Sequence, residues 1–164
     1  MANEYNPEYR YIFPSYDWDD VWIVNQIINL PEIVGAKNIG FLKGVPNEEI
    51  KKNNDLIRKW IDENMEKCSC LILFVGEKTY QSYWVKYEIE LARKLEKGRF
   101  IINLEGMKRQ DNSICKKGQD PYSYHGLYTN NAVKAYMIKQ YSWINDDGIS
   151  YISNWIEDAI DRAK

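Results

Sequence analysis

The sequence has few of the residues that build disulfide frameworks, metal sites or histidine-based active sites. Its 164 residues include three cysteines, Cys68, Cys70 and Cys115, and one histidine, His125. Three thiols cannot all pair within one chain, and their spacing matches no zinc motif, so we expect incidental thiols in a reduced, cytoplasmic protein. We expect His125 to be a solvated loop residue, and we expect no metal site.

Long apolar runs, an excess of charge and nucleotide-binding glycine motifs are also missing. No apolar run reaches about 18 residues, and the first ten residues lack the apolar segment of a signal peptide. The net charge is −2, so no general basic field favours nucleic acid or a membrane as a partner. Neither G-x-G-x-x-G nor G-x-x-x-x-G-K-[ST] occurs, which argues against the usual dinucleotide and P-loop phosphate sites.

Strand-like and helix-like segments alternate along the chain. Apolar runs predict strands at residues 9–16, 38–42, 70–76 and 99–104, with a shorter candidate at 132–138. Apolar residues at helical spacing predict helices at 17–30, 49–66, 84–98 and 149–164. This order predicts an α/β fold, a flavodoxin-like three-layer α/β/α sandwich around a parallel sheet of order 2-1-3-4-5.

We expect one domain over residues 1–164, with three local irregularities. Residues 1–8 form a polar arm that we expect to be flexible. Residues 105–131 are polar, turn-rich and without periodicity, which indicates a long functional or mobile loop. Pro14 lacks a backbone donor, so the first strand is expected to end or kink there.

Ligands of such sheets bind beyond the carboxyl ends of the strands, at the point where the strand order reverses. The segments to inspect are therefore SYDWDD, after the first strand, and GEKTYQSYW, after the third. The three aspartates of the first segment would repel the phosphate of a flavin nucleotide. A receiver domain needs a phosphoacceptor aspartate after the third strand, where this chain has FVGEK.

The helix expected from Trp84 onward carries two glutamates on opposite faces. At about 100° per residue, Glu88 falls in the middle of the apolar arc of this helix. The apolar members of that arc are Trp84, Val85, Ile89, Leu91, Ala92 and Leu95. Glu90 falls on the charged face, four residues from Lys86 and from Lys94, where exposed pairs contribute roughly 0.2–0.5 kcal/mol each.

Glu88 therefore needs an explanation, and three remain open. A carboxylate on a packing face must be buried at a substantial cost or face a cleft. Glu88 could bond the N-terminal amides of its own helix, pair with a buried arginine or lysine, or serve a functional site. Its place beside the expected reversal of strand order favours a cleft, but geometry alone leaves structure and function evenly balanced.

Two segments resemble TIR domains. Phe13-Pro14-Ser15-Tyr16 is similar to the [FI]-x-S-[FY] end of the first TIR strand, although Pro14 replaces a residue that is usually apolar or aromatic. Ser82-Tyr83-Trp84-Val85-Lys86-Tyr87-Glu88 resembles the S-x-W-V-x-x-E segment that carries the catalytic glutamate of NAD-consuming TIR domains.

Three longer segments are similar, more narrowly, to the TIR-like ThsB family of Thoeris anti-phage defence. They are WVKYEIELARKLEKG, KKGQDPYSYHG and YSWINDDGISYISNWIEDA. The resemblance implies an enzyme that cleaves the nicotinamide–ribose bond of NAD+ and rejoins ADP-ribose into a cyclic signalling nucleotide. In such systems the product activates a separate effector protein. NAD+ would be the substrate, and no cofactor is expected.

The resemblance makes Glu88 the expected catalytic residue. Nicotinamide leaves as a neutral pyridine, so no general acid is needed, and one carboxylate can stabilise the developing cation by charge. Ser15 and Tyr16 are expected to contact the ribose or base, and Asp17 to favour the cationic nicotinamide ring. Trp84 would line the pocket, although core packing explains it equally well. Candidate partners of the pyrophosphate are Lys43, Lys86 and Arg10.

Three other functions remain open for a chain of this kind, and the last in rank is an unrelated nucleotide-processing enzyme on the same fold, which is an analogy at fold level only. A non-catalytic TIR domain would act as an interaction module, and its helix and loop surfaces would bind other TIR domains. A plain NAD+ hydrolase would release linear ADP-ribose. A homo-oligomer or a phage component is a further expected partner, as the trigger of activity.

Overall fold

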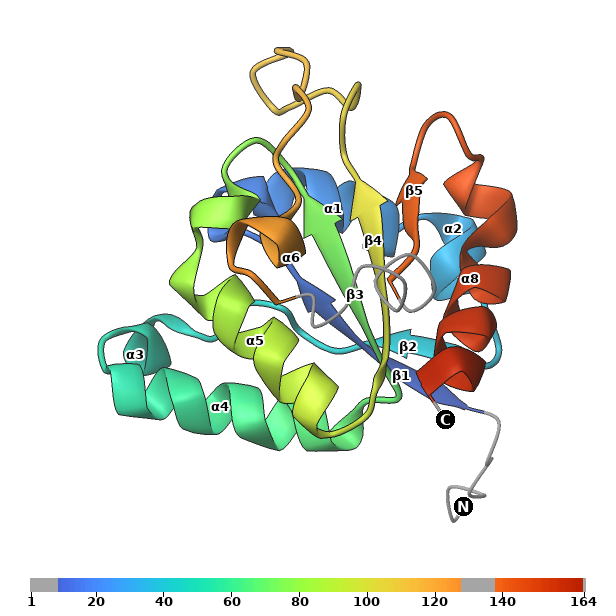
Figure 1. Ribbon diagram of the computed structural model, residues 1–164. Coiled ribbons are helices and arrows are strands. Elements are labelled where there is room, and N and C mark those ends of the chain that lie inside the picture. Colours follow the sequence, from blue (N-terminus) through green and yellow to red (C-terminus); the bar gives the residue numbers. More distant parts are fainter. Residues whose placement is uncertain (1–8, 128–137, 164) are drawn as a thin grey trace.

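The computed structural model describes residues 9–127 and 138–163. The arm at 1–8 and most of the candidate strand at 132–138 lie outside these ranges. The described residues form a five-stranded parallel sheet of order β2-β1-β3-β4-β5, as predicted (Figure 1). The strands are β1 (Arg10–Ser15), β2 (Ile39–Phe41), β3 (Cys70–Val75), β4 (Gly98–Asn103) and β5 (Gln140–Ser142).

The fifth strand lies after the segment predicted for it. Gln140–Ser142 pairs in parallel with Ile101–Asn103 of β4, whereas Ile138, the described end of the predicted segment, is buried but has no regular structure. The rest of the predicted segment, 132–137, lies outside the described residues. The sequence did not predict the strand at 140–142, because pairing at a sheet edge depends on the neighbouring strand and single-strand propensity is a weak guide there.

Helices cover both faces of the sheet. The long helices are α1 (Val21–Ile28), α4 (Asn54–Lys67), α5 (Tyr83–Lys94) and α8 (Gly148–Ala163). The short ones are η1 (Trp18–Asp20), α2 (Pro31–Val34), α3 (Glu48–Lys51), η2 (Thr79–Gln81) and α6 (Pro121–Tyr124). None of the described helices combines the length and apolarity needed to cross a membrane.

Side-chain caps divide the predicted helix at 49–66 in two. The Asn53 side chain accepts hydrogen bonds from the backbone N–H groups of Asp55 and Leu56, so a new helix begins at Asn54. An asparagine in extended conformation is a favoured N-cap, because its side chain satisfies amides that have no partner inside the helix. The apolar spacing runs through this break and therefore does not reveal it.

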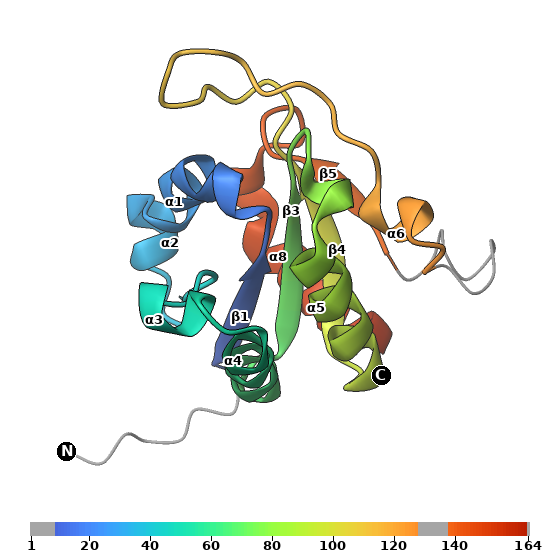
Figure 2. The ribbon, with the colours of Figure 1, turned by 90° about the vertical axis from the view of Figure 1, so that its left-hand side faces the viewer.

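Two apolar layers meet at β3, whose six residues are all buried. Cys70, Ile72 and Phe74 pack with residues of α1 and α8, while Leu71, Leu73 and Val75 pack with residues of α4 and α5. Figure 2 shows α1 on one side of β3 and α5 on the other. This confirms the continuous apolar run at 70–76 as a strand that is covered on both faces.

Pro14 neither ends nor kinks β1, so the expectation at this residue is wrong. The strand runs to Ser15 and keeps its register with β3, where Pro14 lies opposite Ile72. Ile12 accepts a hydrogen bond from Leu42 on the β2 side, and Pro14, two residues on, faces the same side. Since β2 has ended at Phe41, the missing donor removes no bond from the sheet.

Candidate functional site

Glu88 lies in the second turn of α5 with its carboxyl group directed at the end of β1. Ser15, the last residue of β1, donates a hydrogen bond from Oγ to Glu88 Oε2 over 2.5 Å. Ser15 is 0% exposed and Glu88 is 3% exposed. Val85 and Ile89 are buried on the same face of α5, so the predicted packing face with a carboxylate in its middle is confirmed.

The contact with Ser15 decides between the structural explanations of Glu88. The cap of α5 is Ser82, which accepts from the Val85 N–H at 3.3 Å, so Glu88 is not the cap. Among the described residues no cation forms an ion pair with Glu88, and the Ser15 hydroxyl is the hydrogen-bond donor that reaches it. A buried acid that lacks a positive partner is costly to the fold, which points to a role outside folding.

Burial dominates the electrostatics of this carboxyl group. Removal from water raises the pKa of Glu88 to about 8, and the hydrogen bond from Ser15 opposes the rise. Tyr16, the next residue after β1, is also buried, and burial followed by the nearby Glu88 raises its pKa to about 12. Tyr16 packs in the α1 and α8 layer and Glu88 lies on the α5 side, yet the two groups are close enough at the carboxyl end of β1 to interact electrostatically.

Asp17 lies in a neighbouring acidic pocket. This pocket, of about 190 Å³, is lined by Asp17, Asp19, Asp20, Glu77, Lys78 and Arg109. It joins the segments that follow β1 and β3, where the strand order reverses. No three His, Cys, Asp or Glu side chains within 9–127 and 138–163 are grouped as a metal site would require.

Comparison with known proteins identifies the family of this site. Residues 13–110 match the model of the Thoeris protein ThsB, TIR-like domain. The chain belongs to this ThsB TIR-like family. The matched region contains Ser15, Glu88 and Arg109, and thus both sides of the reversal of strand order.

A curated relative extends the likeness beyond that region. The protein named "Putative cyclic ADP-D-ribose synthase ThsB1", from Bacillus cereus (strain MSX-D12), is 23% identical over 150 residues. The alignment covers 66% of this chain and 77% of the relative. The ThsB family predicted from sequence motifs is therefore confirmed.

Arg109 is the residue of this ThsB-family site that the sequence did not reveal. It donates from Nη1 to Asp20 Oδ1 at 2.9 Å, and its Nη2 lies 3.6 Å from Glu77 Oε1. Asp20 is buried, which raises its pKa, and Arg109 opposes that rise. Arg109 lies in a loop whose sequence has no periodicity. Its position at the strand ends is set by the path of the loop, which the local sequence does not predict.

The long loop after β4 is attached to the strand ends along its first half. Lys108 and Ile114 form an antiparallel bridge, and Cys115 is buried in the α1 and α8 layer. The Lys116 N–H donates to Glu77 Oε1 at 2.8 Å, and a Cβ added to Gly118 would collide with the Gly76 carbonyl. Residues 105–118 therefore pack on the segment that follows β3, while the functional or mobile nature of the loop at 105–131 stays a prediction.

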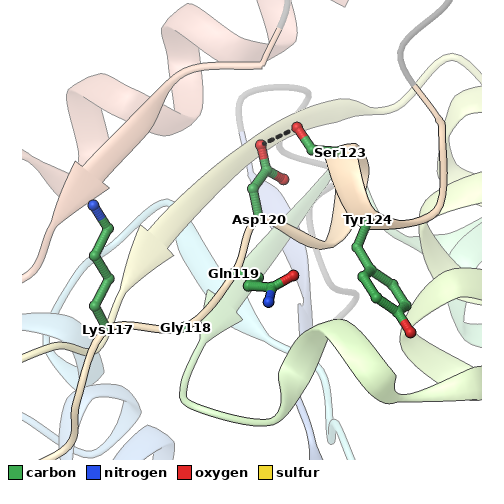
Figure 3. Close-up of a pocket in the computed structure, with 6 residues that line it drawn as sticks. All are labelled: Lys117, Gly118, Gln119, Asp120, Ser123 and Tyr124. Atoms are coloured by element: carbon green, nitrogen blue, oxygen red, sulfur yellow. Dashed lines mark hydrogen bonds between the residues drawn. The ribbon is translucent and has the colours of Figure 1, made fainter.

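A second pocket, of about 600 Å³, lies where this loop enters α6. Its lining residues are Lys117, Gly118, Gln119, Asp120, Ser123 and Tyr124. Figure 3 shows Lys117 and Tyr124 at opposite ends of the row, with a hydrogen bond between Asp120 and Ser123 at 3.4 Å. The Tyr124 ring contacts the Tyr80 ring of η2 edge-on at 4.9 Å, so α6 lies beside the turn that precedes α5.

Trp84 and Lys86 lie apart from both pockets. Trp84 is half-buried in a row of edge-to-face aromatic contacts with Tyr83 and Tyr87, at 4.9 and 5.9 Å between ring centroids. Lys86 is half-buried on α5 and lines neither pocket. The structure therefore brings Ser15, Tyr16 and Glu88 together, with Asp17 beside them.

Glu90 is exposed, as expected from its face of α5. The expected pairing with Lys86 and Lys94 is wrong, since the i,i+4 ion pairs of the described residues lie in α4 and α8. Glu90 and Lys94 are exposed and Lys86 is half-buried, and the gain from one fixed ion pair at such a surface is small.

Proposed function

We propose that this chain cleaves the nicotinamide–ribose bond of NAD+ and closes the ADP-ribose into a cyclic signalling nucleotide. The observation that supports this most directly is the Glu88 carboxyl group, buried without a cation and bonded by Ser15 at the end of β1. The name of the Bacillus cereus relative, a cyclic ADP-D-ribose synthase, supports the same chemistry.

Glu88 is the catalytic residue of this proposal. The ribose carbon gains positive charge as neutral nicotinamide departs, and a carboxylate placed beside it stabilises that charge. Such stabilisation is stronger in an apolar site than in water, because the effective dielectric is lower. NAD+ itself brings a cationic ring, which favours the ionised form of Glu88 once it is bound.

Tyr16 and Asp17 are the proposed contacts of the substrate. Tyr16 lies next to Ser15 in the chain and keeps its hydroxyl proton at neutral pH, so it can donate to a ribose oxygen. Asp17 stands in the pocket of about 190 Å³ and adds negative charge for the cationic ring. Trp84 and Lys86 are weaker candidates in this arrangement, because the ring contacts of Trp84 are with Tyr83 and Tyr87 and Lys86 does not bond the Glu88 carboxyl group.

Exclusion of water favours ring closure over hydrolysis. Glu88 is 3% exposed, so the substrate must displace part of the packing to reach it and leaves little room for water. A ribosyl cation formed in a closed site is then captured by another group of the same molecule. We propose that the cyclic product activates a separate effector protein, as in a Thoeris system.

The test compares Glu88→Gln with Glu90→Gln, a matched pair on opposite faces of one helix. Purified chains are incubated with NAD+, and nicotinamide and the nucleotide products are followed by mass spectrometry. Glu88→Gln should abolish turnover, whereas Glu90→Gln should retain most of it, at melting temperatures that show both variants folded. Equal losses, or full activity of Glu88→Gln, would contradict the assignment.

The same experiment separates the proposed reaction from the alternatives. A cyclic product supports ring closure, linear ADP-ribose indicates a plain hydrolase, and no nicotinamide release indicates an interaction module. Because enzymes of this kind can require a phage component, the variants are also compared in infected cells. A wild-type chain that is silent in both settings would overturn the proposed function.

A further inference from the structure

We infer that Ser15 is a positioning residue that holds the Glu88 carboxylate for reaction, and that it is not a ligand of the substrate. The inference rests on the proposed function, because it concerns the same carboxyl group. It differs from the sequence-based expectation, in which Ser15 contacts the ribose or base.

The backbone of Ser15 is fixed by the centre of the sheet. β1 lies between β2 and β3, and Ser15 pairs in register with Leu73 of the fully buried strand β3. The side chain of a strand residue has little freedom when its neighbours are close-packed. Ser15 therefore offers Glu88 a hydroxyl group whose position is set by the register of β1 with the buried strand β3.

The one hydrogen-bond donor of the Ser15 side chain is committed to Glu88. A serine hydroxyl has one proton to donate, and the 2.5 Å contact from Oγ to Glu88 Oε2 uses it. Ser15 is 0% exposed, so a substrate that displaces the packing around Glu88 meets a serine whose one proton is already donated to the carboxylate. Ser15 thus acts through Glu88, and Tyr16 and Asp17 remain the residues placed to meet the substrate.

A donated hydrogen bond favours the charged form of a carboxyl group, and catalysis by charge needs that form. Tyr16 is the described titratable group coupled to Glu88, and it remains uncharged until about pH 12. The titratable groups on the elements around this site interact with one another in the pairs Asp20–Arg109, Asp62–Tyr87 and Arg99–Tyr122. Ser15 is therefore the described group that works against the burial of Glu88.

The experiment measures NAD+ cleavage as a function of pH for the full chain with Ser15→Ala, Ser15→Thr and Ser15→Cys. In Ser15→Ala we expect the midpoint of the rise in kcat to move up by about one pH unit, or about tenfold in rate below the midpoint. KM should change little. Ser15→Thr keeps the hydroxyl and should restore the profile, whereas Ser15→Cys keeps the shape with a weaker donor and should behave like Ser15→Ala.

A titration of the carboxyl group itself makes the test independent of activity. The chain is labelled with glutamate carrying ¹³C at the carboxyl carbon, and the Glu88 signal is identified by its loss in Glu88→Gln. Its midpoint should lie well above those of the exposed glutamates and rise further in Ser15→Ala. If Ser15→Ala does not fold, the pH profile of NAD+ cleavage and the carboxyl titration are both measured on Ser15→Cys.

The outcomes separate this inference from the proposed function. An unchanged Glu88 midpoint in the folded Ser15 variants, or a raised KM with an unchanged pH profile, would overturn the role of Ser15 and leave the reaction in place. A wild-type chain that never releases nicotinamide would overturn the proposed function, while the carboxyl titration still decides whether Ser15 controls Glu88.

Discussion

Glu88 holds its proton more tightly in the folded chain than in the unfolded one. Its ordinary pKa of 4.5 rises to about 8 on burial. Between these values the folded state keeps a proton that the unfolded state has lost, so the unfolded state gains relative stability as pH increases. The free energy of unfolding therefore falls from about pH 4.5 to about pH 8 and then levels off.

Replacing Glu88 by glutamine should remove that loss of stability. We expect Glu88→Gln to melt at nearly the wild-type temperature near pH 4.5 and several degrees higher at pH 8 to 9. At about 1.4 kcal/mol per pKa unit, the raised pKa of Glu88 lowers the free energy of unfolding by a few kcal/mol at high pH. In a chain of this size each kcal/mol changes the melting temperature by roughly 2–4 °C. Thermal unfolding followed by circular dichroism across pH checks this.

Glu90→Gln is the control, because Glu90 is exposed on the opposite face of α5. Its melting temperature should follow the wild type at every pH. A Glu88→Gln variant that is destabilised equally at pH 4.5 and pH 9 would show that Glu88 is not held protonated by its surroundings.

At the scale of elements, the loop at 105–118 is held to the sheet by charge as well as by packing. Arg109 bonds Asp20 at the start of α1 and approaches Glu77 after β3, while Cys115 packs in the α1 and α8 layer. Asp20 is buried, and removing its cation would leave a buried carboxylate unpaired. The Arg109 contacts therefore connect the loop to both strand ends at once.

Arg109→Ala should let this loop detach before the rest of the chain unfolds. We expect Cys115 to react with a thiol reagent on the order of tenfold faster in the variant, since one such charged hydrogen bond is worth about 1.5–3 kcal/mol. Mass spectrometry of the labelled peptides checks the rate at each cysteine.

Cys68 and Cys70 are internal controls in the same molecule, because both are buried at the other end of the sheet. Their labelling should stay at the wild-type rate. Equal acceleration at all three thiols would mean that Arg109 stabilises the whole fold and has no separate effect on the loop.

At the scale of the whole molecule, the sheet makes the two apolar layers depend on each other. β3 contributes alternate residues to both layers. A substitution that loosens the packing on one face of β3 therefore also weakens the layer on its other face. Ile156 of α8 is fully buried against one face, whereas Tyr151 of the same helix is 52% exposed.

Ile156→Ala should lower the melting temperature by on the order of 10 °C, since a buried isoleucine cut to alanine costs about 2–5 kcal/mol. Tyr151→Ala should change it little. Tryptophan fluorescence and circular dichroism should still report one transition, because tryptophans lie in both layers, with Trp155 in one and Trp60 in the other. Two separated transitions would show that the layers unfold independently.

The sequence predicted most of this architecture because parallel βαβ units repeat a local pattern. Helical spacing alone placed Glu88 on a packing face, since periodicity is a property of neighbouring residues. Arg109 and β5 were missed for the opposite reason. Their positions depend on contacts such as Arg109 with Asp20 and Gln140 with Ile101, between residues far apart in the chain.

Pro14 determines what can lie beside the last residues of β1. Beyond Ile12, β1 has β3 on one side and no described strand on the other, although Pro14 and Ser15 are buried. The loop after β2 covers this side, and a Cβ added to Gly44 would collide with the Pro14 carbonyl. Because proline has no backbone donor, strand pairing can stop here without leaving a buried N–H unsatisfied. The proline thus lets a loop pack beside the residue that bonds Glu88.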